Sequence, residues 1–118
     1  MKICKGTNRV VILCGKFAFK IPNFLNGHLL FLHGCLANWR ERYFCKVAKS
    51  SNIELYNHVA PSLFCSWFGL LQIQIRCTKN TLPLLDKDLK VFEIISSDVN
   101  ICNTGWYKHR LVLFDYGD

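Results

Sequence analysis

The chain has 118 residues, of which 51% are hydrophobic and 14% aromatic, and its formal net charge is +7 at pH 7. The length suits a single domain, the apolar content argues against a disordered chain, and the lack of an apolar run of about 18 residues argues against a membrane span. The positive charge favours an acidic partner, such as a nucleotide or an acidic protein surface; the basic residues are dispersed, so nucleic acid is not favoured.

Residues 2–21 predict three short strands. The second, "VVILC", is rich in β-branched residues, and "GK" then predicts a tight reversal into the third, "FAFKIP". In this third strand Ala18 and Lys20 alternate with apolar residues, so they share one face.

The segment from about Leu29 to Ala48 has helical spacing. Its residues at steps of three and four are Leu36, Arg40, Tyr43, Phe44 and Val47, with Trp39 beside them. This spacing predicts that the aromatic residues pack into the core, and it disfavours the alternative that "NWRERYFCK" is a basic–aromatic patch for nucleic acid. Glu41 lies beside the apolar stripe and is expected to face inward at its flank.

The second half of the chain predicts further strands and one more helix. "IELYNHVAP" is ambiguous, whereas "SLFCSW" and "GLLQIQIRC" predict an antiparallel pair joined near Phe68 and Gly69. "TKNTLP" predicts a loop, "LLDKDLKVFEIIS" has helical spacing, and the final stretch predicts a hairpin that turns near residues 107–109 and returns through "RLVLF". Strands and helices segregated in this way indicate an α+β domain.

The seven cysteines are odd in number and contain no CxxC pair. Most lie within apolar stretches, where cysteine behaves as a small buried hydrophobe. Because no secretory segment is apparent, we expect a cytoplasmic location and no disulfides.

The order of several polar residues along these elements resembles the protein-kinase-like fold. "FAFKIP" is similar to the family's V-A-I-K strand, with Ala18 and Lys20 at the motif's Ala and Lys. "LLQIQIRC" stands where the family has its hinge strand, "DVNICN" has the D-x-x-x-x-N spacing of the catalytic loop, and "DYG" stands where D-F-G follows a short hairpin.

The resemblance implies one domain with two parts. Residues 1–77 would form a kinase N-lobe-like antiparallel sheet with one main helix. Residues 78–118 would form a vestigial C-lobe, made of a short helix and a hairpin that carries the catalytic loop and the DYG segment.

The resemblance also implies an ATP and Mg²⁺ site, and a role for each matching residue. Lys20 would hold nucleotide phosphates, Glu41 would orient Lys20, and Asp98 would accept the proton of the attacking hydroxyl. Asn103 and Asp115 would bind magnesium, which prefers oxygen ligands. The nucleotide would also lie against Gly6, Ala18 and the main chain around Ile75 and Cys77.

Each of these residues also has a structural interpretation. A strand lysine, a helix glutamate and an Asn-Thr-Gly turn are common in proteins without any active site, and Asp98 follows two serines as a capping residue would. The chain also departs from the family. It has no G-x-G-x-x-G loop, and only about twenty residues separate the hinge from the catalytic loop, so the protein-substrate platform is missing.

Two functions follow from these observations. The first is a minimal kinase-like phosphotransferase that acts on a larger protein acceptor. The alternative is a kinase-derived binding protein whose catalysis has lapsed, for example a phage-encoded inhibitor of a host defence complex, in which basic residues such as Arg40, Arg42, Lys46 and Lys49 steer an acidic partner.

Overall fold

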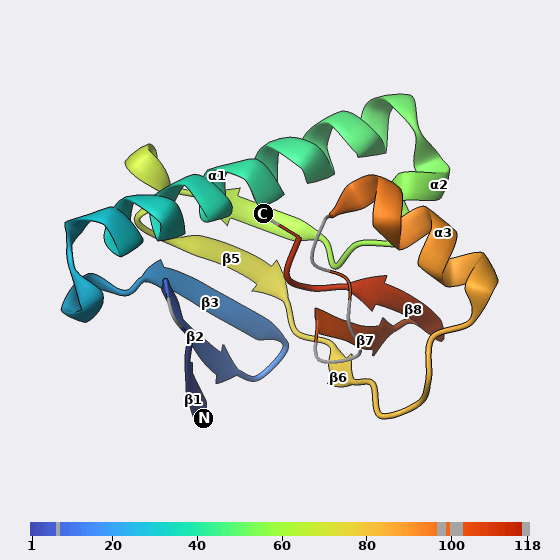
Figure 1. Ribbon diagram of the computed structural model, residues 1–118, viewed down its shortest axis with the longest axis horizontal. Helices are drawn as coiled ribbons and strands as arrows, with labels where there is room; N and C mark the ends of the chain where they lie inside the picture. The colour runs from blue at the N-terminus through green and yellow to red at the C-terminus, as the bar shows by residue number, and fades with distance from the viewer. Residues whose placement is uncertain (7, 97–98, 100–102, 117–118) are drawn as a thin grey trace.

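The structure is a computed structural model that describes residues 1–118 except residues 7, 97–98, 100–102 and 117–118. It is an α+β fold in which one long helix lies across a five-stranded antiparallel sheet, with a smaller sheet and a short helix beside it (Figure 1). None of the helices in the described part of the chain combines the length and the apolar character that a bilayer crossing requires.

The larger sheet has the strand order β1-β2-β3-β5-β4, so the third strand lies at its centre. Its strands are β1 (Lys2–Lys5), β2 (Arg9–Cys14), β3 (Phe17–Pro22), β4 (Ser62–Cys65) and β5 (Gln72–Ile75). The tight turn between β2 and β3 uses Gly15 at φ 58°, a conformation that glycine adopts at little cost. The three N-terminal strands and the later antiparallel pair therefore agree with the sequence prediction.

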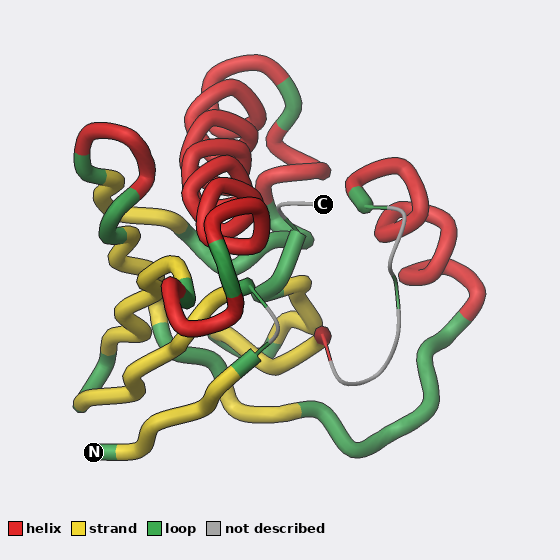
Figure 2. The backbone as a smooth tube through the Cα atoms, turned by 60° about the vertical axis from the view of Figure 1, so that its left-hand side comes forward, coloured by secondary structure: helices red, strands yellow, loops and turns green. Residues whose placement is uncertain are grey.

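The long helix α1 (His28–Ser51) follows β3 and packs on one face of the larger sheet, as Figure 2 shows. It is preceded by the short 3-10 helix η1 (Phe24–Asn26) and followed by α2 (Ile53–Tyr56). The Asn52 side chain accepts from the Leu55 amide and so caps α2. A second 3-10 helix, η2 (Trp67–Gly69), joins β4 to β5 and touches α1.

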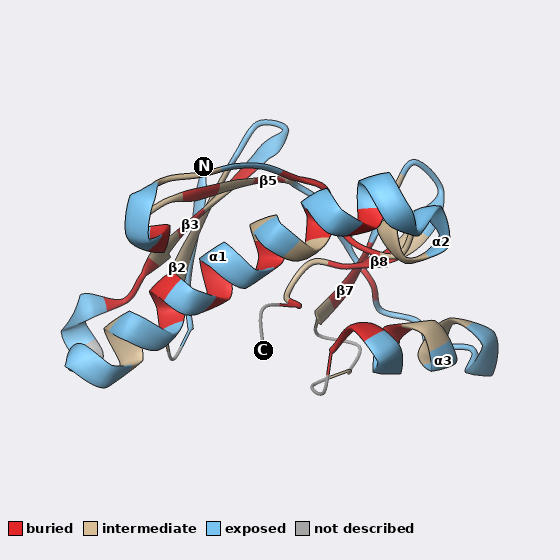
Figure 3. Cartoon of the chain, turned by 90° about the horizontal axis from the view of Figure 1, so that it is seen from above, coloured by how far each residue is buried: buried red, intermediate tan, exposed pale blue. Residues whose placement is uncertain are grey.

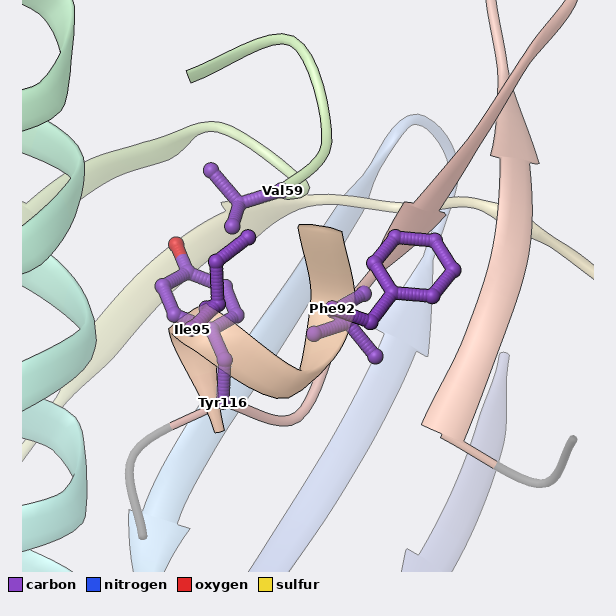
Figure 4. Close-up of a cluster of buried hydrophobic side chains, with 5 residues drawn as sticks. Val59, Phe92, Ile95 and Tyr116 are labelled. Atoms are coloured by element: carbon purple, nitrogen blue, oxygen red, sulfur yellow. The ribbon is translucent and has the colours of Figure 1, made fainter. Parts of the chain in front are cut away.

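The smaller sheet has the order β6-β7-β8 and carries the last hairpin of the chain. Its strands are β6 (Thr78–Lys79), β7 (Thr104–Tyr107) and β8 (Arg110–Leu113), and the helix α3 (Asp86–Ile95) lies between β6 and β7 in the sequence. A cluster of buried apolar side chains joins α3 to this region (Figure 4); its members are Val59, Phe92, Ile95, Leu113 and Tyr116.

The prediction for the buried face of α1 is confirmed for Glu41 and Phe44 and wrong for the other apolar residues. Figure 3 shows the buried residues on the side of α1 that faces the sheet, and these are Gly34, Cys35, Ala37, Asn38, Glu41, Cys45 and Ala48. The apolar residues that were expected in the core but are exposed are Leu36, Trp39, Tyr43 and Val47. Phe44 is partly buried and packs against the apolar cluster as expected, with its ring centroid 5.9 Å from that of Tyr116. The reason is that α1 approaches the sheet through small and polar side chains, so the side with the largest apolar residues remains outside.

Three smaller predictions need adjustment. "TKNTLP" was expected to be a loop, but Thr78–Lys79 pairs with β7 as a short strand. The ambiguous segment after α1 contains the helix α2. The six cysteines in the described residues are free thiols; Cys35 and Cys45 are buried as expected, whereas Cys4 and Cys14 are exposed.

Gly69 fixes the position of η2 against α1, which gives a testable prediction. Gly69 has φ 67°, and a Cβ atom there would lie 2.0 Å from the carbonyl oxygen of Cys35. Gly69→Ala should therefore lower the free energy of unfolding by about 2 kcal/mol, measured by urea denaturation. Gly15→Ala is the matched control, because Gly15 has a similar φ of 58° but no atom within 4 Å of an added Cβ. If both variants lose the same amount, crowding against α1 is unimportant.

Candidate functional site: a buried charged cluster

Strand β3 and helix α1 bring a lysine and a glutamate into contact. The Nζ atom of Lys20 donates to the Oε1 atom of Glu41 at 2.8 Å, and both side chains are buried. Lys20 shares the inner face of β3 with Ala18, as their alternation predicts. Glu41 lies between the small buried residues Ala37 and Cys45, each four positions away on the same face of α1. The structure thus joins two of the residues that the sequence singled out.

Arg9 is the residue of this site that sequence reasoning missed. It opens β2, and its side chain turns inward beneath the sheet, where only 7% of it is exposed. The guanidinium donates to the Oε2 atom of Glu41 at 2.8 Å and to the Oδ1 atom of Asn38 at 3.1 Å, and it also pairs with Asp115. Arg9 therefore links the first hairpin, the helix and the C-terminal segment.

The segment after β8 closes the cluster from the other side. Asp115 contacts Arg9, the backbone amide of Tyr116 donates to the Oε2 atom of Glu41 at 3.0 Å, and the Lys20 ammonium donates to the carbonyl oxygen of Phe114. The Tyr116 hydroxyl donates to the carbonyl oxygen of Ala60 at 2.9 Å. These bonds fix the Asp-Tyr segment against α1, with the Asp115 side chain 38% exposed at the edge.

Two amide side chains complete the polar surroundings. The Nε2 atom of Gln72, on β5, donates to Glu41 at 2.9 Å and to Asn38 at 3.2 Å. The Nδ2 atom of Asn38 donates to the carbonyl oxygens of Lys20 and Gly69, at 3.0 and 2.9 Å. Buried polar groups that are bonded in this way specify one arrangement of the sheet and the helix.

The electrostatics of the site favour an ionised carboxylate. Burial by itself would raise the pKa of the Glu41 carboxyl, but the charges of Arg9 and Lys20 and their hydrogen bonds hold this pKa well below its usual value. Burial is the largest influence on Lys20 and lowers the pKa of its ammonium group, against the attraction of Glu41. Because a guanidinium remains charged at any ordinary pH, Glu41 keeps at least one cationic partner in every state.

Arg9, Lys20, Glu41 and Asp115 form what we call the charged cluster. It contains two cations and two carboxylates, so its formal charge is zero. Magnesium would require Asp115, whose Oδ1 atom bonds the Arg9 guanidinium. A nucleotide phosphate would require Lys20, whose ammonium group donates to the Phe114 carbonyl oxygen in addition to the Glu41 pairing that the resemblance implies. In this arrangement the residues do not fit a magnesium–nucleotide complex.

The other residues assigned to the nucleotide lie around the same strands. Ala18 is buried and pairs with Gln74 on β5, and Ile75 pairs with Phe17 at the end of that strand. Cys77 is partly buried, and this burial raises the pKa of its thiol to about 11, which makes it unreactive. Gly6 lies in the turn before β2, where its amide donates to the carbonyl oxygen of Arg9 at 2.8 Å.

The hairpin of β7 and β8 brings together the two residues assigned to metal binding, Asn103 and Asp115. The amide of Phe114 donates to the carbonyl oxygen of Asn103 at 3.0 Å, so the backbones of Asn103 and Asp115 are close neighbours. Asp98 lies outside the described residues. Within the described residues, no three histidine, cysteine, aspartate or glutamate side chains gather closely enough to hold a metal ion.

A groove of about 520 Å³ lies elsewhere, along the edge of α1. It is lined by Arg42, Cys45, Lys46, Lys49, Ser50, Tyr56, Pro61, Ser62 and Leu63. Arg42 also donates to the carbonyl oxygen of Ser62 at 2.7 Å, which ties the helix to β4. The basic lining suits an acidic group, and no member of the charged cluster takes part in it.

Searches against protein-family models, curated proteins and solved structures each returned no match. Function must therefore be inferred from the chain's own residues. The charged cluster and the exposed face of α1 are the features from which that inference proceeds.

Proposed function

We propose that the protein is a kinase-like binding protein in which the charged cluster takes the place of a bound nucleotide, and that it acts by contact with another protein. The observation that carries this proposal is the position of Arg9. Its buried guanidinium bonds both Glu41 and Asp115, the carboxylates that the kinase resemblance assigns to lysine orientation and to magnesium.

The kinase-like part of the proposal is supported by topology together with chemistry. The supporting topology is the sheet order β1-β2-β3-β5-β4 with the long helix between β3 and β4, since the resemblance implies an antiparallel sheet with one main helix. The lysine of β3 bonds the glutamate of that helix, and an Asp-Tyr segment follows a hairpin next to the pair. Topology alone would not support this, because one fold carries many functions.

The binding part of the proposal is supported by the energetics of the cluster. A magnesium–nucleotide complex would have to displace Arg9 from Asp115 and compete for the Lys20 ammonium, and disrupting a buried network of ion pairs costs about 3–5 kcal/mol. A cost of about 3 kcal/mol alone weakens binding roughly 100-fold. At about 5 kcal/mol, the upper end of this range, the dissociation constant of an otherwise micromolar site would rise to several millimolar, and about 1 mM ATP would leave the site mostly unoccupied.

The second candidate is the ATP- and Mg²⁺-dependent phosphotransferase acting on a protein acceptor. The specific observation in its favour is that Lys20, Glu41 and Asp115 lie together, although they come from three separate parts of the sequence. In this candidate Lys20 would bind phosphate and Asp115 would hold the metal once Arg9 had moved away.

Titration with ATP distinguishes the two candidates. We expect that about 1 mM ATP with Mg²⁺ gives no calorimetric binding signal and leaves the unfolding temperature unchanged. A ligand at 100 times its dissociation constant would instead stabilise the fold by about 2.7 kcal/mol, which thermal unfolding detects easily. The measurement needs the full chain, with and without Mg²⁺.

Magnesium-dependent binding of ATP that Asp115→Asn removes would overturn the proposal and support the phosphotransferase. Asp86→Asn is the matched control, because Asp86 lies in the exposed first turn of α3, away from the charged cluster. Binding that survives in both variants would place the nucleotide outside the cluster, and the proposed role of Arg9 would then be wrong as well.

A further inference from the structure

The exposed face of α1 carries a continuous apolar stripe. Its members are Leu29, Leu32, Leu36, Trp39, Tyr43 and Val47, each between 43% and 69% exposed. Their steps of three and four residues give the 3.5-residue period of a helix–helix contact. At 1.5 Å per residue the stripe is about 27 Å long, which is enough for a partner helix of several turns.

The fold prevents α1 from turning this stripe inward. Rotation of the helix would withdraw Glu41 from Lys20 and Arg9, and Asn38 from the backbone of Lys20 and Gly69. Such a rotation would leave buried polar and charged groups without partners, which is strongly destabilising. The apolar face is therefore held toward the surroundings by the charged cluster itself.

The 3-10 helix η2 lies against α1 and carries two further exposed aromatic residues. Trp67 and Phe68 are 86% and 83% exposed, and Gly69 holds η2 against the backbone of Cys35 on α1. Phe68 has φ 59°, a strained conformation for a bulky residue. Strain of this kind persists where neighbouring structure enforces it, and it is frequent at binding sites. We call the stripe together with Trp67 and Phe68 the α1 face.

The centre of the α1 face has the character of a binding hot spot. The rings of Trp39 and Tyr43 are stacked with centroids 5.1 Å apart and planes 9° apart. Such a pair is ordered before a partner arrives, so little side-chain entropy remains to be lost on binding. Tryptophan and tyrosine are also the residues that contribute most often to binding energy at protein interfaces.

The charges around the stripe select the kind of partner. Helix α1 carries four basic residues, all of which follow Trp39 in the sequence. Arg42, Lys46 and Lys49 line the groove, and Arg40 comes directly after Trp39. The single acidic residue of α1, Glu41, is buried and paired. A second copy would therefore oppose like charges, whereas a helix with glutamate or aspartate at its flanks would be attracted.

We propose that the α1 face binds an amphipathic helix of another protein, one with leucine-type residues at a 3.5-residue spacing and acidic residues on both sides. The inference rests on the proposed function and gives it a surface and a partner class. A membrane surface is less suited to this face, since the stripe is narrow and follows a helix-packing seam rather than a broad apolar side.

A designed peptide tests the proposal on the full chain. The probe is a helical peptide of four heptads with Leu at positions a and d and Glu at e and g; its counterpart has Lys at e and g. We expect the Glu peptide to bind with a micromolar dissociation constant in fluorescence anisotropy, at least about 10-fold more tightly than the Lys peptide. Raising the salt concentration should reduce this preference.

Variants locate the contact. Trp39→Ala and Tyr43→Ala should each weaken binding of the Glu peptide about 10-fold or more, as expected for hot spots. Ile94→Ala is the matched control, because Ile94 is 73% exposed on α3 and should leave binding unchanged. Lys46→Glu with Lys49→Glu should reverse the preference between the two peptides, whereas Lys87→Glu with Lys90→Glu on α3 should not.

Three results would overturn the proposal. These are equal or absent binding of both peptides, a dimer in sedimentation velocity that Trp39→Ala abolishes, and binding to vesicles of phosphatidylserine and phosphatidylcholine in place of the peptide. None of them depends on nucleotide. A failure here therefore leaves the ATP titration as the separate test of the proposed function.

Discussion

Glu41→Gln is expected to lower the free energy of unfolding by about 3–5 kcal/mol. The substitution keeps the size of the side chain but removes the negative charge that Arg9 and Lys20 share. Both cations would then remain buried with Asp115 as their closest carboxylate, and Lys20 would keep only amide and carbonyl oxygens. A lone buried charge is among the most destabilising changes that a point substitution makes.

Urea denaturation followed by circular dichroism measures this loss, and Glu54→Gln is the control. Glu54 lies in α2, exposed to solvent, and its neutralisation should change the free energy of unfolding by less than about 0.5 kcal/mol. A loss below about 1 kcal/mol for Glu41→Gln would mean that the charged cluster does not hold the sheet, the helix and the C-terminal segment together.

The strands and the two longer helices could be predicted because their signals are local. The alternation of Ala18 and Lys20 with apolar residues defines the inner face of β3, and the turn glycine Gly15 marks the reversal before it. The second hairpin and α3 follow in the same way from short apolar runs and helical spacing. The two-residue strand β6 was missed because its pairing with β7 depends on a partner more than twenty residues away.

The orientation of α1 could not be predicted by the usual rule that the most apolar side is buried. In this helix the buried side carries Ala37, Cys45 and Ala48, which are small, together with Glu41, which is charged. Small residues at steps of three and four were the available signal, and they indicate close approach to another backbone. Hydrophobic periodicity favours the side of a helix with the larger apolar residues, so it indicated the stripe and not the side with the small residues.

The candidate site was predictable only in part. Lys20, Glu41 and Asp115 were singled out through the order of motifs, and the structure places all three in one cluster. Arg9 was missed because "NRVVILC" is an ordinary strand in sequence, and its contacts with Glu41 and Asp115 span 32 and 106 positions. Without Arg9 the charged cluster would have a net negative charge that could suit magnesium. With Arg9 its formal charge is zero, and this favours a binding protein over a phosphotransferase.

The stability of the protein should fall steeply as the pH drops below about 5, and Glu41 should account for much of the fall. Arg9 and Lys20 hold the pKa of the folded Glu41 carboxyl well below 4.5, its ordinary value. Ionised Glu41 therefore contributes fully to the free energy of unfolding at any pH above the pKa of Glu41 in the unfolded chain. As the pH falls from there toward the pKa in the folded protein, the unfolded chain binds a proton at Glu41 and the folded protein does not, so this contribution is lost.

Thermal unfolding of the wild type and of Glu41→Gln between pH 7 and pH 3 tests this. The wild-type curve should decline more steeply, so the two unfolding temperatures should converge as the pH falls, by about 3–6 °C for each kcal/mol of the Glu41 contribution that is lost. Asp115 can pair with Arg9 in both proteins, so both unfolding temperatures should still decrease somewhat as the pH falls. Parallel curves would show that Glu41 is not ionised through its contact with the two cations, and the charge balance on which the proposed function depends would then be wrong.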